Sequence, residues 1–591
     1  MALALGVTWN VDRRLRAFVG MLLAALVLTA AGPVIAQGLA RAGGAPESVI
    51  VRSAPGTTAA AERAVRDLGG TVGREIGIID GFAATVPADG VATLQAQPEI
   101  TEVTPNGRVR LMDTGSYDPT ADAGSLYDTT ISTGAQAYWK KGYTGAGVDV
   151  ALLDSGVSPV EGLSTPGKVV NGPDLSFDSQ SASLQYLDGY GHGTHMAGII
   201  AGRDDAAQPG QYAGDSTDFI GVAPDARIVN VKVADNQGAT DVSQVIAGID
   251  WVVQHRNDNG LNIRVLNLSF GTSSTQSYVL DPLAYAAEVA WKSGIVVVAS
   301  VGNDGPTSNG VADPADDPYV LAVGAADTNG QNSPSNFSVA SFSSWGTSRN
   351  PDLVAPGVHL ASLRDPGSVI DQAHGATATV ATRFFRGSGS SQAAAVISGA
   401  AALAVQQHPT WTPDQIKQLL VSTSLNLKAP AKPNDEGHGV VNLNHALGTG
   451  VGAFKQNFPA SNGTGSLEAA RGSLHVTSSN GVTLTGEQDI FGNAFNSAAM
   501  AAAEASGQSW SAGSWNGQSW SGQSWSGQSW SGQSWSGQSW SGQSWSGQSW
   551  SGQSWSGQSW SGQTWSGQSW SGQTWSGQSW SGEGWACDDW E

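Results

Sequence analysis

Four segments of the chain hold the residue types that acyl transfer chemistry requires. Asp154 ends the apolar run ALLD, His192 lies in DGYGHGTHMAG, Asn303 lies in VGNDG, and GSGSSQAAAVISG (387–399) offers four serines. A serine hydroxyl becomes a nucleophile when a base such as histidine takes its proton. A carboxylate then fixes the imidazole tautomer, and an amide stabilises the oxyanion that forms. The four segments are therefore candidates for one catalytic site.

The elements that must position these residues alternate between strands and helices. From about residue 137, apolar, β-branched runs are separated by helical patterns. The runs cover residues 148–153, 228–233, 263–268, 295–300 and 319–324. Such strands are typical of a sheet buried on both faces, so the pattern predicts an α/β domain with a mainly parallel sheet flanked by helices. Asp154 and Asn303 follow two of the strands, where functional residues of parallel sheets lie.

Each candidate has another explanation when it is taken alone. Asp154 suits a turn before Gly156, Asn303 suits a turn within GND, and the serines suit a helix N-cap. Turns and caps are more frequent than active sites. The catalytic hypothesis therefore depends on the four segments occurring together in one chain order.

That order and the motifs around it resemble the subtilisin-like serine peptidases, or subtilases. LLDSGV resembles the family's aspartate motif, GHGTHMAG its histidine motif, and GSSQAAAVISG its serine motif. Supporting segments follow in the family's order: GVAPDARIVNVKV, LNLSFG, VGNDG, PADDPYVLAVGA, FSSWG and DLVAPGV. The resemblance covers residues 137–448 and implies a three-layer subtilisin-like catalytic domain.

The resemblance implies a role for each candidate residue. Aligning the serine motif so that Gly399 matches the family's helix glycine makes Ser391 the nucleophile. His192 would be the general base and Asp154 its orienting carboxylate, in the chain order Asp, His, Ser that subtilisin uses. Asn303 would hold the oxyanion.

LNLSFG would supply a substrate-binding edge strand around Ser269 and Gly271, which pairs with an extended peptide. The segment near Ala312 and Asp313 should line the first specificity pocket, but it does not match the family closely, so the side-chain preference is not predicted.

Metal binding is not required by this chemistry. His192 and His195 are spaced for one helix face, but no third zinc ligand and no H-E-x-x-H motif accompany them, so we expect no metal there. A structural calcium ion is an open alternative, because an insertion after the histidine motif carries four aspartates with hard oxygen donors. They are Asp204, Asp205, Asp215 and Asp218.

The N-terminal part indicates secretion and a zymogen. Residues 1–36 combine arginines, a short apolar run and small residues before a cleavage point, which is typical of a signal peptide; a membrane anchor is the alternative. Residues 46–111 predict a small α+β unit, and 112–136 a linker. The subtilase resemblance implies that this unit is a propeptide that inhibits the enzyme until self-cleavage between about residues 110 and 137.

The C-terminal part is of low complexity. Residues 449–505 are predicted to be a linker and residues 506–591 a repeat tail. Its residues 506–590 form seventeen pentads, mostly SGQSW, that hold 17 of the 23 tryptophans. Gly and Ser favour a flexible chain, and the indoles give it adhesive points. Three hypotheses stay open for this tail: a flexible sticky chain, self-association as stacked β structure, and a cell-surface glycan-binding surface.

The overall charge limits the partners. The chain has 49 acidic and 28 basic residues and a net charge of -21, which disfavours nucleic acid or an anionic membrane. The leading hypothesis is a secreted serine endopeptidase that acts on protein or peptide substrates. The alternatives are an inactive subtilase-like carrier of the tail and a serine esterase, and the sequence holds no G-x-S-x-G motif for the latter.

Overall fold

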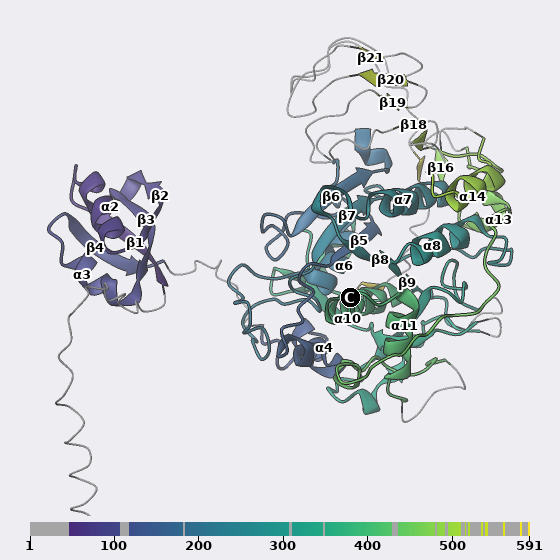
Figure 1. Cartoon of the computed structure of the whole chain (residues 1–591), viewed down its shortest axis with the longest axis horizontal. Coiled ribbons are helices and arrows are strands. Elements are labelled where there is room, and N and C mark those ends of the chain that lie inside the picture. Colours follow the sequence, from purple (N-terminus) through teal and green to yellow (C-terminus); the bar gives the residue numbers. More distant parts are fainter. Residues whose placement is uncertain are drawn as a thin grey trace, which may run out of the picture. The chain divides into compact units, whose positions relative to one another are not determined.

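The chain divides into two compact units in its computed structural model, residues 1–112 and 113–591, and each is considered by itself (Figure 1). The structure describes residues 46–106, 117–180, 184–306, 310–346, 349–427, 435–478, 482–490 and 494–509, and short strands in the repeat tail. The predicted signal peptide, 1–36, lies outside these residues. No helix among those described is long and apolar enough to cross a membrane.

The first unit is a small α+β domain. Its antiparallel sheet has the strand order β2-β3-β1-β4, with two short α-helices. The bounds are β1 Pro46–Ser53, α2 Thr58–Asp67, β2 Thr71–Ile76, β3 Gly81–Pro87, α3 Val91–Gln95 and β4 Ile100–Pro105. Val51, Val65, Phe82 and Leu94 are fully buried between sheet and helices. Strand β2 was not predicted, because it is largely exposed and lacks an apolar alternation.

The second unit is built on a mainly parallel sheet. In the described part of the chain it has eight strands in the order β11-β10-β9-β8-β5-β7-β6, with β12 beside β10. All its pairs are parallel except β10 with β11. The strands are β5 Asp149–Asp154, β6 Val169–Asp174, β7 Arg227–Lys232, β8 Ile263–Leu268, β9 Val296–Ser300, β10 Leu321–Asp327, β11 Ser338–Val339 and β12 Leu353–Pro356. The predicted runs are confirmed as strands of one sheet.

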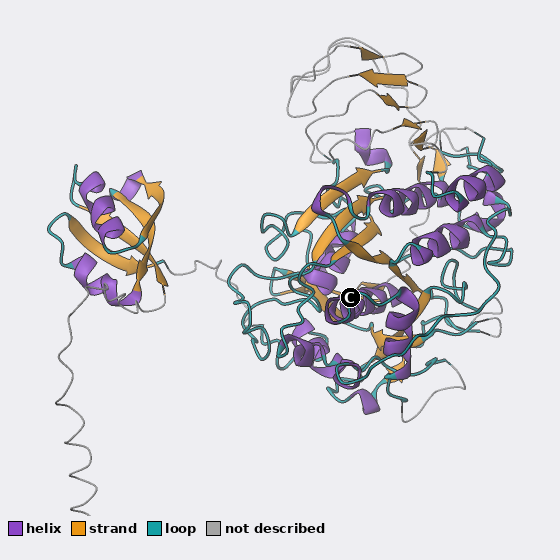
Figure 2. Ribbon diagram, viewed as in Figure 1, coloured by secondary structure: helices purple, strands orange, loops and turns teal. Residues whose placement is uncertain are grey.

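Helices lie on both sides of this sheet (Figure 2). Helix α6 (His192–Ala201) packs on α10 (Ser390–Gln407), and α10 also contacts β8, β9 and β10. Helix α7 (Val242–His255) packs on α8 (Pro282–Lys292). This arrangement is the predicted α/β fold with helical layers flanking the sheet.

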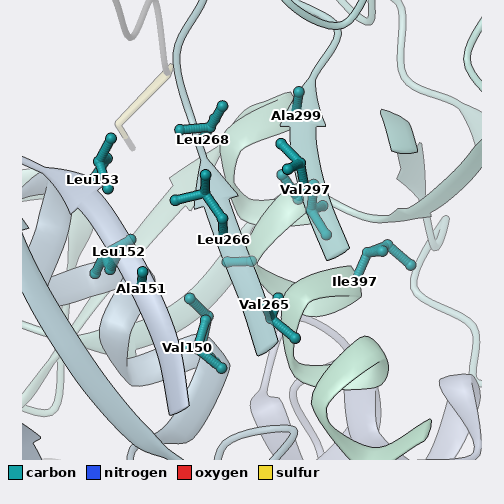
Figure 3. Close-up of a cluster of buried hydrophobic side chains, with 14 of the residues drawn as sticks. Val150, Ala151, Leu152, Leu153, Val265, Leu266, Leu268, Val297, Ala299 and Ile397 are labelled. Atoms are coloured by element: carbon teal, nitrogen blue, oxygen red, sulfur yellow. The ribbon is translucent and has the colours of Figure 1, made fainter. Parts of the chain in front are cut away.

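The sheet is buried on both faces because its strands carry no polar alternation. Val150, Ala151, Leu152 and Leu153 are successive residues of β5, and all four are fully buried. Figure 3 shows them with side chains of β8 and β9, and with Ile397 of α10. Burial of the middle of β5 fixes the strand, and so fixes the position of the residue at its carboxyl end.

Beyond residue 450 the chain continues as part of the second unit. The segment 449–505, which the sequence indicates as a linker, contains α13 (Leu467–Arg471) and α14 (Ser497–Ala505). Tyr285 Oη of α8 donates a hydrogen bond of 2.9 Å to the carbonyl of Ala501. Most of the repeat tail, 506–591, lies outside the described residues, and the three hypotheses for it stay predictions.

Candidate active site

Strand β5 places Asp154 at the carboxyl edge of the sheet. Asp154 is the last residue of β5 and is 4% exposed. Its Oδ1 accepts hydrogen bonds from the backbone N–H of Ser155 at 2.8 Å and from Ser155 Oγ at 3.2 Å. The carboxylate is therefore held in one orientation beside the start of the next element.

Helix α6 places His192 against this carboxylate. His192 is the first residue of the helix, and Gly191 before it has φ of 107°, a conformation that favours glycine. His192 Nδ1 lies 2.7 Å from Asp154 Oδ1. The carboxylate accepts a hydrogen bond from Nδ1–H, which favours the tautomer whose Nε2 is the basic nitrogen of the neutral ring. The pair therefore presents a base whose tautomer is set by Asp154.

Glycine at position 193 permits the close approach of α6 to β5. A Cβ atom on Gly193 would lie 2.1 Å from the carbonyl oxygen of Gly156 and 3.1 Å from Asp154 Oδ1. A larger residue would push the helix away from the strand, and the His192–Asp154 contact would be lost.

Asp188 organises the same corner, and sequence reasoning missed it. Its Oδ1 accepts from Ser155 Oγ at 2.8 Å and from the Gly191 N–H at 2.7 Å. Its Oδ2 accepts from the Thr194 N–H at 2.7 Å. Asp188 thus satisfies N–H groups at the start of α6 and links Ser155 to the helix. The available signal was its position four residues before His192 in the motif DGYGH.

Two of the serines before Ser391 make bonds to backbone groups. Ser388 Oγ accepts from the His359 N–H at 2.9 Å, and Ser390 Oγ accepts from the Gly302 N–H at 3.2 Å. Ser391 is the second residue of α10 and is 2% exposed. Its Oγ donates to the carbonyl oxygen of Ser269 at 3.1 Å.

Asn303 lies beside the start of α10. Its Oδ1 accepts from the Ser390 N–H at 2.8 Å. This bond fixes which end of the amide is the oxygen, and so fixes Nδ2 as the donor end. The first N–H groups of a helix have no partner within the helix, so the start of α10 and the Asn303 amide together form a donor-rich environment.

A pocket lies beside Asp154 and His192. Its lining comprises Asp154, Ser155, Tyr190, His192, Val233, Ala234, Gly238, Thr240, Ser269 and Phe270. Ser391 is not among the lining residues, but its hydroxyl donates to the carbonyl of Ser269, which lines this pocket together with His192. The apolar part of the lining comes from Val233, Ala234 and Phe270.

Gly271 meets the segment that the sequence indicates for the first specificity pocket. A Cβ on Gly271 would lie 2.7 Å from the Ala312 Cβ. Thr272 and Asp313 exchange two backbone hydrogen bonds of 2.9 Å each. Burial raises the pKa of Asp313 well above its usual range, and the neighbouring carboxyl group of Asp281 raises it further. The segment that meets Gly271 therefore carries a buried carboxyl group, Asp313, that favours its neutral, protonated form.

His195 is packed into the domain. The His195 Nε2 atom lies 3.0 Å from the Phe385 carbonyl oxygen. Ser362 Oγ donates a hydrogen bond of 2.8 Å to the His195 carbonyl oxygen. Among the described residues, no group of three or more His, Cys, Asp or Glu side chains is arranged to hold a metal ion.

The aspartates of the insertion make bonds within the protein. Asp204 forms an ion pair with Arg383 at 2.5 Å, and Asp205 accepts from Thr165 Oγ1. Asp215 Oδ1 accepts the backbone N–H of Asp218 at 3.2 Å. Arg383 neutralises Asp204 in this arrangement, and a structural calcium ion at the insertion stays a prediction.

Comparisons with known proteins find relatives for two parts of the chain. The model of the subtilase family matches residues 145–450, and a model of a peptidase inhibitor domain matches residues 36–106. The chain is 37% identical over 311 residues to serine protease AprX of Bacillus subtilis (strain 168), which covers 51% of this chain and 67% of AprX. It is 35% identical over 316 residues to subtilisin of Bacillus pumilus, which covers 53% of this chain and 95% of that protein.

A solved structure also aligns with the chain. It is that of a cold adapted subtilisin-like serine proteinase, at 30% identity, with a TM-score of 0.37 and coverage of 51% of this chain and 88% of that one. The family match spans more than half of the chain. This chain belongs to the subtilase family of serine peptidases, with an inhibitor-like domain before the peptidase domain.

Proposed function

We propose that this chain is a secreted serine endopeptidase, made as a zymogen, that cleaves peptide bonds through Ser391, His192 and Asp154. The observation that carries the proposal is the 2.7 Å contact between His192 Nδ1 and Asp154 Oδ1, in a pocket shared with Ser269. The Ser391 hydroxyl donates to the carbonyl of Ser269, which supports a serine beside this pair. A base, its orienting carboxylate and a serine hydroxyl are the parts that an acyl-enzyme mechanism needs.

The first chemical step requires a rotation of the Ser391 hydroxyl. When substrate binds, Oγ leaves the Ser269 carbonyl and gives its proton to His192 Nε2 while it attacks the peptide carbonyl carbon. Asp154 stabilises the imidazolium that forms and is not itself protonated. His192 then donates the proton to the leaving amine, and the acyl-enzyme is hydrolysed by water through the same steps in reverse order.

The oxyanion of the tetrahedral intermediate would lie at the start of α10. The Asn303 amide nitrogen and the Ser391 backbone N–H are the donors. The bond from the Ser390 N–H to Asn303 Oδ1 holds the amide before substrate arrives, so little reorganisation is needed during the reaction.

An extended peptide would bind along the chain that follows β8. Residues Ser269 to Gly271 would pair with the substrate backbone, and the apolar pocket wall of Val233, Ala234 and Phe270 would take an apolar side chain of the acyl half. This predicts a preference for apolar residues on the amino side of the cleaved bond.

The N-terminal inhibitor-like unit would keep the enzyme inactive until maturation. The match of residues 36–106 to a peptidase inhibitor domain supports this role. Self-cleavage between about residues 110 and 137 would then release the peptidase. Residues 1–36 would direct the protein out of the cell. An inactive carrier of the tail is less favoured, because the chain retains Asp154, His192, Asn303 and Ser391 together.

Processing of the purified precursor tests this function. We expect the wild type to lose its N-terminal unit and to hydrolyse casein, and Ser391→Ala to do neither. Ser388→Ala is the matched control from the same segment, and it should process normally because the Ser388 hydroxyl accepts a hydrogen bond from the His359 N–H and is proposed for no step of the reaction. Normal self-processing by purified Ser391→Ala would contradict the proposal.

A further inference from the structure

Two walls line the candidate substrate cleft. One contains Ser269 and Phe270 after β8, and the other contains Val233, Ala234, Gly238 and Thr240 before α7. A peptide bound between them contacts both, so their relative position affects substrate binding. A segment of the chain beyond the family match, residues 461–478, contacts the continuation of each wall.

The first wall is held by the backbone of α13. Thr272 directly follows Gly271 and is 1% exposed. Its Oγ1 donates to the carbonyl oxygen of Ala470 at 2.5 Å. The Thr275 N–H donates to the Ala469 carbonyl at 3.0 Å. These two carbonyls belong to α13, so the helix fixes the loop that leaves the substrate strand.

Further contacts extend this attachment. The Gln276 side chain and the Ser466 backbone exchange two hydrogen bonds, of 2.8 and 3.0 Å. Gly472 approaches so closely that a Cβ there would lie 2.1 Å from the Ser273 carbonyl oxygen. The Ser273 and Ser473 hydroxyls lie 2.9 Å apart. The loop and the segment 461–478 therefore form one continuous packed interface.

Arg471 connects this interface to the second wall. Its side chain is fully buried, and its Nε donates to Asp241 Oδ2 at 2.6 Å. Asp241 directly follows Thr240 of the pocket and is the N-cap of α7. The guanidinium also donates to the carbonyl oxygens of Gly486 at 2.6 Å and Gln488 at 2.5 Å. One side chain thus joins α13 to the start of α7.

The physical character of this contact favours a positioning role. Desolvation offsets much of the Coulomb energy of a buried ion pair, so stability alone is a weak reason for its presence, although removal of one partner leaves a buried charge unpaired and destabilises the fold. The geometry of the pair is strictly defined by the planar fork of arginine. We propose that Arg471 is a positioning residue for the peptidase reaction, which holds the two walls of the substrate cleft at the spacing that an extended peptide requires. The proposal rests on the function proposed above.

Kinetics with two substrates test this role in the matured enzyme. One substrate is a tetrapeptide p-nitroanilide that spans both walls, and the other is p-nitrophenyl acetate, which reaches only the serine. We expect Arg471→Gln to raise KM for the tetrapeptide about 10-fold or more while kcat for the ester changes by less than about 2-fold. Arg471→Lys retains the charge and should restore part of the loss. Thr272→Val removes only the bond to Ala470 and should raise KM by a smaller factor.

A matched control separates positioning from general stability. Arg227 also pairs bidentately with a buried aspartate, Asp149, but at the opposite end of the strands. Arg227→Gln should lower Tm without changing the ratio of the two activities. The proposal would be overturned if Arg471→Gln lost activity equally on the tetrapeptide and on the ester. It would also be overturned if neither Arg471→Gln nor Thr272→Val changed the ratio of the two activities. If the wild type reacted with neither substrate, the proposed peptidase function would fail instead.

Discussion

The two ends of strand β5 carry buried aspartates in opposite settings. Asp149 begins the strand and is bound by Arg227 through two hydrogen bonds of 2.6 Å, and by the Asn262 N–H at 2.6 Å. Asp154 ends the strand, and its Oδ1 lies 2.7 Å from Nδ1 of the His192 imidazole, a group that is charged only when protonated. Asp154 Oδ2 has no hydrogen-bond partner among the described residues.

The nature of the partner, arginine for Asp149 and histidine for Asp154, indicates which carboxylate has a structural role and which is suited to proton transfer. A guanidinium is always charged, so Asp149 has a permanent counter-ion and its energy does not change during a reaction. An imidazole gains its charge only when it accepts a proton, so Asp154 stabilises His192 most strongly at the moment when Ser391 is deprotonated. In the proposed mechanism, the same residue type on the same strand therefore serves stability at one end and catalysis at the other.

Substitution at the carboxyl end should have the largest effect. Asp154→Asn leaves the shape intact but removes the charge and favours the wrong imidazole tautomer. We expect kcat/KM for a peptide substrate to fall about 10⁴-fold, with little change in Tm. Steady-state kinetics and a thermal melt on the same preparation check this. A loss of activity below about 10-fold would remove Asp154 from the mechanism.

Asn303 sharpens the assignment of the oxyanion donors. Asn303→Ala removes the side-chain donor while the Ser391 N–H remains. We expect kcat to fall about 100-fold to 1000-fold with KM nearly unchanged, because the oxyanion exists only after attack. A rise in KM with unchanged kcat would indicate that Asn303 binds the ground state instead.

Substitution at the amino end of β5 should give the opposite pattern. Asp149→Asn removes the charge that Arg227 and the Asn262 N–H contact. We expect a loss of about 1–3 kcal/mol in the free energy of unfolding and unchanged kcat/KM. Denaturant melts in the Ser391→Ala background avoid self-digestion. An activity loss comparable to that of Asp154→Asn would invalidate the comparison of the two ends.

The stability of the second unit should depend on pH where α14 packs on the rest of that unit. Burial, together with the neighbouring carboxyl group of Asp250, raises the pKa of Glu504 to about 9. Between about pH 4.5 and 9, Glu504 stays protonated in the folded protein but is ionised in the unfolded chain, where its pKa is the ordinary 4.5. The free energy of unfolding therefore falls as pH rises through this range. Glu504→Gln should raise Tm increasingly across this range, by the equivalent of about 1 kcal/mol or more at pH 8. If the difference in Tm between Glu504→Gln and the wild type were the same at pH 4 and at pH 8, this prediction would be contradicted.

The sequence predicted the sheet well because its strands are uniformly apolar. The runs 148–153 and 263–268 correspond within one residue to β5 and β8. Strand β2 was missed because an exposed edge strand needs no apolar pattern. The helices in 449–505 were also missed, because α13 has only five residues and its arginine is buried by partners distant in the chain.

The candidate site was predictable where motif and element end coincide. Asp154 and His192 stand at the termini of β5 and α6 and meet as expected. Asp188 was not predicted because its bond to Ser155 spans 33 positions of the chain, although its bonds to Gly191 and Thr194 are local. Arg471 was not predicted because it meets Asp241 across 230 positions. Local patterns carry no information on such pairs, which only the packing of the elements brings together.

The central claim is that His192 activates Ser391, and covalent labelling tests it most directly. The matured protein would be treated with a fluorophosphonate and the modified residue identified by peptide mapping. The account predicts a label on Ser391 that is lost in His192→Ala, a variant whose fold can be checked by its thermal melt. No label on folded, propeptide-free wild type, or an equal label in His192→Ala, would contradict it.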